Sequence, residues 1–526
     1  MSLTTFEKEK VLAPFLGSPL NFVPGQDPLG LLNVGELAFN KLLPGMTTVS
    51  ERIRYYSFYC WFFDLYASQV GIASSKEQFK YLRRAEYLIA LLAAKKHWQG
   101  VPGINKALGT YNILVEQIDL TEGTGERQAT FDNTYWKNSK GVFGQNYVSS
   151  MTQMGFVKER VEGEGVFIRT DFNIEGRISG AQLAQAFQDN IGINASDTFL
   201  QVLIRGNVTQ AELELFADPF NMLQVPSPST ENQFLWQFLI GPDFPKNHKE
   251  SFFRRRTIQL LLQKTIEKDK ATSALEFVLT AYHQQGRSDI GSDETLKLWY
   301  NFQLEQFWHM AATGSLQAFL DYLNNNTGGV WIEEDVLITE IAIKIEGFLK
   351  ESGFSNEPAT FENLKVVSDS EEKLVENMKD KDPIKKMGYA CLLLRKLIEI
   401  NISEVEDLEK MITKYQMQSP SSFLQSIKDL IFLSDMRMES FISLFIKKYV
   451  VLRHQWVALR KMNDTQTTEK FIREDGFIRY LSSIDYGYSA PRIDTVLGFI
   501  EDLQILERKR ETLTKFGSQL YNEIPL

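Results

Sequence analysis

Residues 155–170 read Gly-Phe-Val-Lys-Glu-Arg-Val-Glu-Gly-Glu-Gly-Val-Phe-Ile-Arg-Thr, two short apolar runs on either side of a Glu-Gly-Glu-Gly turn. Two β-favouring runs joined by a glycine-rich turn predict a β-hairpin. A helical pattern covers 144–154 before the hairpin, and another covers 179–187 after it. This order of helix, strand, turn, strand and helix is typical of a winged helix. We therefore predict a winged-helix-like segment over 129–192.

A second segment of this type is expected at the C-terminus, over 467–526. We expect a helix over 471–481 and another beginning near Pro491, since proline favours the first helical turn. The second helix has one apolar face, formed by Ile493, Val496, Leu497, Ile500 and Leu503. Residues 506–511 and 512–515 are then expected to pair as a hairpin, followed by a short final helix.

The remaining sequence has helical periodicity. A loop-rich arm with a helix at 31–42 opens the chain, and longer helices are expected from about residue 50 and over 75–98. Residues 324–329, which contain three asparagines and two glycines, are predicted to form a linker. We predict a mainly α protein in which three helical segments, 1–128, 193–327 and 328–466, alternate with the winged segments 129–192 and 467–526.

The composition indicates a folded protein with more than one core. The chain has 526 residues, of which 43% are hydrophobic and 12% aromatic. This length exceeds a single ordinary core, and the aromatic content argues against disorder. The two cysteines, Cys60 and Cys391, stand alone in apolar runs, which suits a reducing compartment. Because no signal-peptide pattern and no apolar stretch of bilayer length occurs, we expect a cytoplasmic protein without a membrane partner.

The charge distribution argues against a dedicated nucleic-acid binder. The net charge is −10, whereas affinity for phosphates requires a basic surface. The central hairpin turn carries two glutamates that would repel phosphate, so a structural or protein-docking role is favoured there. At the C-terminus protein docking is favoured over DNA contact by a smaller margin, because limited DNA contact is expected from Arg492, Arg508, Lys509 and Arg510.

A further basic cluster lies beside two phenylalanines in the middle of the chain. It consists of Arg254, Arg255 and Arg256, and it follows Phe252 and Phe253. Adjacent aromatic and cationic groups are typical of single-strand binding grooves. The alternative, which we favour, is a solvated helix face with one phenylalanine turned inward. Arg52 and Arg54 are expected to be partly buried and paired with acidic residues.

No catalytic signature is present. The five histidines, at positions 97, 248, 283, 309 and 454, have no histidine, cysteine or carboxylate partner at a metal-binding spacing. Glycine-rich phosphate loops and the nucleophile-elbow motif are also missing. Glu340 and Lys344 stand one helical turn apart and are expected to form a surface ion pair rather than part of a nuclease site. We predict a non-enzymatic protein with no cofactor, no metal ligand and no small-molecule substrate.

Two short windows resemble uncharacterised bacterial proteins of anti-phage defence loci. The first comprises Asp-Pro-Leu-Gly at 27–30, Leu-Pro-Gly-Met-Thr at 43–47 and Arg-Ile-Arg-Tyr-Tyr at 52–56. The second comprises Leu-Arg-His-Gln-Trp-Val-Ala at 452–458, with Lys461 and Asp475-Gly476. The C-terminal segment is similar to winged-helix domains, which include DNA readers and docking subunits of SMC-type complexes. These resemblances imply a bacterial or archaeal origin and membership of a multi-subunit system.

The leading hypothesis is therefore an accessory subunit of a bacterial defence or DNA-processing complex. Its helical and winged modules would dock protein partners, with limited DNA contact. A DNA-binding regulator or sensor is the first alternative, and a basic groove joining Arg254, Arg255 and Arg256 to the C-terminal wing would favour it. An enzyme of unfamiliar type is the second, and it would require a pocket with converging carboxylates or histidines.

Overall fold

The computed structural model describes residues 21–524 apart from 24, 26, 72–73, 125, 127–137, 175, 242–249, 286–292, 464–465, 508, 510 and 511. The chain is mainly helical, with small two- and three-stranded sheets, as predicted. It forms two compact units, each built from separate stretches of sequence. The α3 unit, named after helix α3 (Arg54–Gln69), contains Phe39–Phe277 and Ala490–Leu526. The α14 unit, named after helix α14 (Glu294–Thr327), contains Met1–Ala38 and Val278–Ser489.

Helix α3 forms the centre of the α3 unit. Every residue from Arg54 to Phe63 is buried, because aromatic side chains project on all sides of the helix. Its principal neighbour is α8 (Gly180–Ile191), which begins with a capping box between Ser179 and Gln182. The ring of Trp61 packs against Phe187 and against Phe199 of α9 (Ile193–Arg205). Aromatic packing of this kind makes a dense core and orders the surrounding helices.

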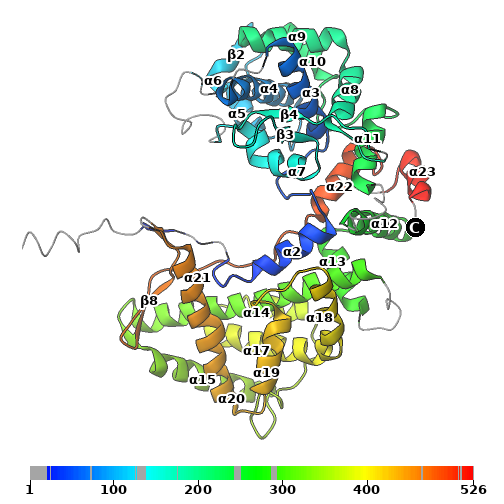
Figure 1. Cartoon of the computed structure of the whole chain (residues 1–526). Helices are drawn as coiled ribbons and strands as arrows, with labels where there is room; N and C mark the ends of the chain where they lie inside the picture. The colour runs from blue at the N-terminus through cyan, green and yellow to red at the C-terminus, as the bar shows by residue number, and fades with distance from the viewer. Residues whose placement is uncertain are drawn as a thin grey trace, which may run out of the picture. The chain divides into compact units, whose positions relative to one another are not determined.

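The other elements of the α3 unit can be followed in Figure 1. They are α4 (Ser75–Lys96), α5 (Ile104–Thr110), β2 (Gln117–Asp119), α6 (Leu120–Thr124), the π-helix η1 (Phe143–Tyr147), α7 (Val148–Gln153), β3 (Val157–Glu159), β4 (Phe167–Arg169), α9 (Ile193–Arg205), β5 (Asn207–Thr209), α10 (Gln210–Ala217), α11 (Thr230–Ile240), α12 (Glu250–Lys268), α22 (Ile493–Asp502) and α23 (Lys515–Glu523). The helices α2 (Leu32–Leu42) and α13 (Ala274–Gln285) contain the residues at which the chain passes between units.

The central hairpin has the predicted order of elements. Strands β3 and β4 pair antiparallel, η1 and α7 precede them, and α8 follows. The turn between them includes Gly163 and Gly165, both with positive φ, a conformation that glycine adopts without steric cost. The assignment of this segment as a winged helix stays a prediction.

Helix α14 forms the core of the α14 unit. It is buried on nearly all sides, and α17 (Pro383–Asn401) packs along it. Figure 1 shows α19 (Phe423–Phe432) and α21 (Arg453–Lys461) in front of this pair. The remaining elements of the unit are β1 (Asn21–Phe22), β6 (Ile332–Glu333), α15 (Glu334–Glu351), α16 (Glu371–Asn377), the 3-10 helix η2 (Ile402–Glu404), α18 (Val405–Lys414), α20 (Met438–Phe445), the π-helix η3 (Ile446–Leu452), β7 (Gln466–Thr467), β8 (Phe471–Glu474) and β9 (Phe477–Tyr480).

The helix predicted over 471–481 is wrong. Strands β8 and β9 form a hairpin there, and β6 extends it to a three-stranded sheet. Asp475 and Gly476 both have positive φ at the turn, the geometry of a tight hairpin turn that favours an Asp-Gly pair. This local turn signal outweighs the helical spacing of the apolar residues. Residues 324–327, part of the predicted linker, instead complete α14, which Gly328 caps in the left-handed conformation.

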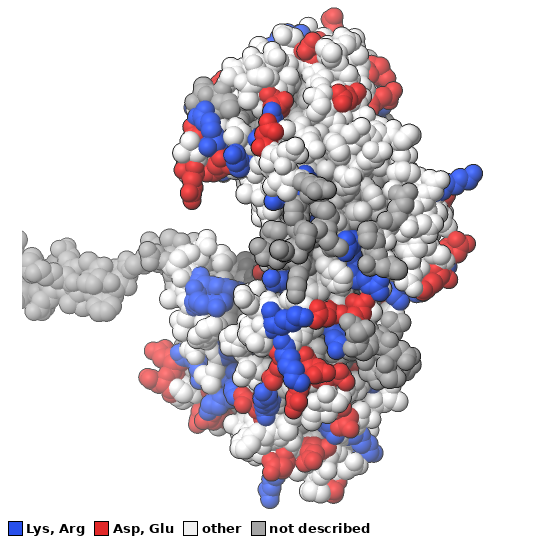
Figure 2. Space-filling model, turned by 45° about the vertical axis from the view of Figure 1, so that its right-hand side comes forward, with Lys and Arg blue, Asp and Glu red and all other residues white. Residues whose placement is uncertain are grey.

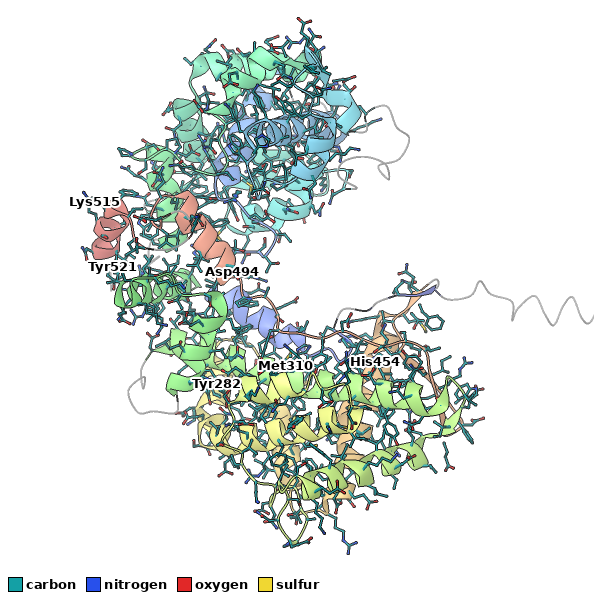
Figure 3. All side chains as sticks on the ribbon, turned by 180° about the vertical axis from the view of Figure 1, so that it is seen from behind. Tyr282, Met310, His454, Asp494, Lys515 and Tyr521 are labelled. Atoms are coloured by element: carbon teal, nitrogen blue, oxygen red, sulfur yellow. The ribbon has the colours of Figure 1, made fainter. Side chains whose placement is uncertain are left out.

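The end of the chain agrees with the prediction in part. Helix α22 forms, and all five residues of its predicted apolar face are buried. Only one bridge, between Leu506 and Leu513, represents the expected hairpin among the described residues. Helix α23 follows it, and Figure 3 labels Lys515 and Tyr521 on this helix. Arg508 and Arg510 lie outside the described residues.

Candidate interaction surface

A continuous helical segment in the α14 unit presents apolar side chains to solvent. It comprises α20, the π-helical turns of η3 and then α21. Leu452, Trp456 and Leu459 are 43%, 54% and 51% exposed. Their spacing of four and three residues places them on one face of the helix. We call these three residues the α21 stripe.

The opposite face of the same segment is buried and firmly held. His454 accepts a hydrogen bond at Nε2 from the Lys470 backbone N–H at 3.0 Å, so its Nδ1 donates to the Pro28 carbonyl, also at 3.0 Å. Burial lowers the pKa of His454 to about 4, and the ring is therefore neutral. Arg453 Nε donates to the Leu29 carbonyl at 2.7 Å. These contacts fix the rotation of α21, so the outward direction of the stripe is set by the fold. Figure 3 labels His454 on this helix.

Cations adjoin the α21 stripe. The Arg460 guanidinium lies over the Trp456 ring at 4.7 Å from its centroid, a cation–π arrangement. Lys461, in the last turn, is exposed and donates to the Asp27 carbonyl at 2.8 Å. Figure 2 shows acidic and basic side chains interspersed over the α14 unit on the face that it presents. The stripe is therefore an apolar strip with a basic end.

A second apolar edge belongs to α19. Phe432, the last residue of this helix, is 82% exposed, and Ile431 is 37% exposed. The Tyr449 hydroxyl, on η3, donates to Asp429 Oδ2 at 3.2 Å, which places α19 beside the segment that carries the stripe. Isolated exposed apolar residues are common on protein surfaces. Outward aromatic side chains on two neighbouring helices make this region a candidate interaction surface.

The arginine triplet predicted for nucleic-acid contact lies mostly inside the α3 unit. Arg254 is 4% exposed, and its guanidinium donates to the carbonyls of Leu239 at 2.8 Å and Pro44 at 2.7 Å, and also to that of Phe238. Burial lowers the pKa of Arg254 to about 10. Arg255 is also buried, while Arg256 is half-buried and donates to Gln259 Oε1. The favoured solvated-face alternative is wrong for Arg254 and Arg255, although Phe253 is turned inward as expected.

The C-terminal cations are differently placed. Arg492, just before α22, is half-buried, lies over the Phe39 ring and donates to Asn40 Oδ1 at 3.2 Å. Lys509 is exposed. Asp494, labelled in Figure 3, is exposed in the first turn of α22. Lys509 is therefore exposed, whereas Arg254 and Arg255 are buried. DNA contact by the predicted basic residues stays a prediction.

The remaining charged residues that the sequence singles out form structural pairs. Arg52 NH1 lies 2.8 Å from Asp502 Oδ1, and Arg54 Nε lies 3.2 Å from Glu231 Oε1, which confirms that these arginines pair with acids. Burial raises the pKa of Asp502 to about 7. Glu340 and Lys344 form the predicted surface ion pair at 2.8 Å.

Comparison with protein-family models, with curated proteins and with solved structures finds no match to this chain. Within the described part of the chain, none of the helices is both long and apolar enough to span a bilayer. The sequence alone does not single out the α21 stripe, because the surrounding stretch has a mixed apolar and charged pattern. The spacing of Leu452, Trp456 and Leu459 was the available signal, but the direction of that face depends on the contacts of His454 and Arg453.

Proposed function

We propose that the chain is a non-enzymatic adaptor that docks a helix of a partner protein on the α21 stripe. The observation that carries this proposal is the outward display of Leu452, Trp456 and Leu459 on a helix whose other face is anchored. Side chains at positions i, i+4 and i+7 match the spacing with which one helix packs against another. Tryptophan and arginine are also the residue types that most often dominate interface energies.

The charges beside the stripe define the chemistry of the partner. Arg460 and Lys461 lie at its C-terminal end, so the partner helix should carry apolar residues on one face and Asp or Glu beside them. Such pairing contributes more to orientation and association rate than to affinity. Burial of the α21 stripe against the partner helix would supply most of the affinity, since burial of apolar area is the main favourable term in binding.

The resemblance to bacterial defence proteins suggests where to look for this partner. We propose membership of a defence or DNA-processing complex, so the products of neighbouring genes are the first candidates. The decisive experiment co-expresses the tagged full chain with these products and measures the affinity of any purified pair. The variant carries Trp456→Ala with Leu459→Ala. The matched control carries Val336→Ala with Ile343→Ala, two α15 residues that are each 53% exposed.

We expect the stripe variant to lose more than about 30-fold in affinity, as for loss of an interface hot spot. The control variant should bind like the wild type. Equal binding by the wild type and the stripe variant would overturn the proposed docking site. Charge reversal at Arg460, by Arg460→Glu, should mainly slow association and weaken its salt dependence.

Limited DNA contact through the C-terminal wing is the second proposed property, and exposed Lys509 supports it. Replacing Arg508, Lys509 and Arg510 by alanine should weaken DNA binding and reduce its dependence on salt. A protein that contacts fewer phosphates releases fewer counterions when it binds. A titration of the isolated protein with duplex DNA at two salt concentrations measures both quantities. Unchanged binding by the triple variant would remove the wing from the proposal.

A further inference from the structure

A histidine and two glutamates meet in the α14 unit, far from the α21 stripe in sequence. His283 lies near the end of α13, and Glu371 and Glu372 open the first turn of α16. His283 Nε2 lies 2.7 Å from Glu372 Oε1. One ligand atom from each of the three residues lies within 4.8 Å of the other two. That separation allows a single ion to contact all three.

Two polar atoms at this cluster have no hydrogen-bond partner. Glu372 Oε2 is shielded from solvent and unpartnered, although the side chain as a whole is 29% exposed. The hydroxyl of Tyr488 is likewise shielded and unpartnered, and Tyr488 is close enough to both glutamates for their charges to raise its pKa, after the larger effect of burial. Shielded polar atoms are normally satisfied, and an ion between the carboxylate and the imidazole would give Glu372 Oε2 a partner.

A network of hydrogen bonds positions Glu371 from behind. Glu371 is 3% exposed, and its Oε1 accepts from the Tyr282 hydroxyl at 3.1 Å. Asn401 Nδ2 in turn donates to the Tyr282 hydroxyl at 3.2 Å, and the Tyr300 hydroxyl donates to Asn401 Oδ1. Figure 3 labels Tyr282 on α13. Metal-binding carboxylates are commonly oriented by such outer hydrogen bonds.

We propose that His283, Glu371 and Glu372 bind one divalent transition-metal ion of the zinc type. One imidazole nitrogen and two carboxylates suit zinc and its neighbours better than magnesium or calcium, which prefer oxygen ligands alone. His283 is 46% exposed, so an ion can enter from solvent and keep water as a further ligand. The ion would replace the direct contact between His283 and Glu372, and it would offset the charge of the buried carboxylate.

The proposal is independent of the α21 stripe, so either can fail alone. A metal that ties α13 to α16 would stabilise the α14 unit, since a ligand that binds only the folded state raises its stability.

The test is a zinc titration of the chelator-treated full chain by isothermal calorimetry, with thermal unfolding recorded in parallel. We expect one equivalent of zinc to bind and the unfolding temperature to rise. His283→Ala and the conservative Glu372→Gln should each weaken binding by more than about tenfold and abolish the thermal shift. His97→Ala, which removes an exposed histidine in the α3 unit, should leave both unchanged.

Circular dichroism of Glu372→Gln without metal provides the folding control. Millimolar magnesium should not displace the zinc. Absence of stoichiometric zinc binding, or binding that survives in both His283→Ala and Glu372→Gln, would overturn the proposed site. Equal competition by magnesium would contradict the choice of a zinc-type ion.

Discussion

Arg54 in the α3 unit and Trp456 in the α14 unit have exchanged the environments expected for their residue types. Arg54 is 1% exposed and forms a buried ion pair with Glu231, which also accepts hydrogen bonds from Ser57 and Asn190. Trp456, a large aromatic side chain, is more than half exposed. The comparison shows that a basic motif in this sequence need not be a binding surface and that an aromatic residue need not be core.

Burial of Arg54 and exposure of Trp456 have different consequences, the first for stability and the second for function. A buried charge is tolerated only when partners satisfy it, so Arg54 and Glu231 depend on each other within the fold. An exposed tryptophan contributes little to the stability of the unit that carries it, and under the proposed function its role is contact with a partner helix. Substitutions in the two regions should therefore have opposite effects on stability and binding.

The largest expected effect is on the buried pair. Arg54→Met leaves the Glu231 carboxylate buried without its cation, so we expect the free energy of unfolding to fall by about 3–5 kcal/mol. Urea unfolding of the full chain measures this loss. The control is Lys410→Met, which removes an exposed pair with Asp407 and should cost less than about 1 kcal/mol. Similar losses in the two variants would contradict the importance assigned to burial.

A second buried acid, Glu305 on α14, makes the stability of the α14 unit depend on pH. Burial raises the pKa of Glu305 to about 8, although hydrogen bonds from the Phe423 and Leu424 backbones act against this. The folded state therefore retains a proton that the unfolded state releases above its ordinary pKa near 4.5. The associated stability is fully present below pH 4.5 and is lost as the pH rises toward 8.

Glu305→Gln should remove this dependence, because glutamine stays neutral and still offers an oxygen to the Phe423 N–H. Between pH 4.5 and 8, the wild type should lose up to about 1.4 kcal/mol per pH unit relative to the variant. Urea unfolding at a series of pH values measures the difference between them. Glu86 and Asp502, whose pKa values burial also raises to about 7, affect both proteins alike. Parallel stability curves would show that Glu305 is ionised in the folded protein.

The smallest expected effects compare the two faces of α21. Val457 is 1% exposed, and Val457→Ala should destabilise the α14 unit by about 1–3 kcal/mol through the cavity that it leaves. Trp456→Ala, one residue away, should change the stability by no more than about 0.5 kcal/mol while weakening partner binding. Thermal unfolding of the two variants provides the comparison. A large stability loss in Trp456→Ala would mean that the tryptophan supports this fold rather than a partner.

Several helices could be predicted from the sequence because their signals are local. Helix α4 begins at Ser75 as expected, with Ser74 as its cap, and the apolar face of α22 is readable from spacing alone. The hairpin at Asp475 and Gly476 also had a local signal, which the helical spacing of its apolar residues obscured. Capping groups and turn residues act within a few residues of themselves, so the sequence alone carries this information.

The candidate sites depend on contacts between distant residues. His283 meets Glu372 across 89 positions of the chain, and Arg54 meets Glu231 across 177. No local pattern shows that Arg254 points inward or that Trp456 points outward, because each direction is set by carbonyls and side chains from other elements. The sequence by itself determined where several of the helices form and which side chains they carry. Only the tertiary structure decided which charges are satisfied inside the protein and which side chains remain available to a partner or an ion.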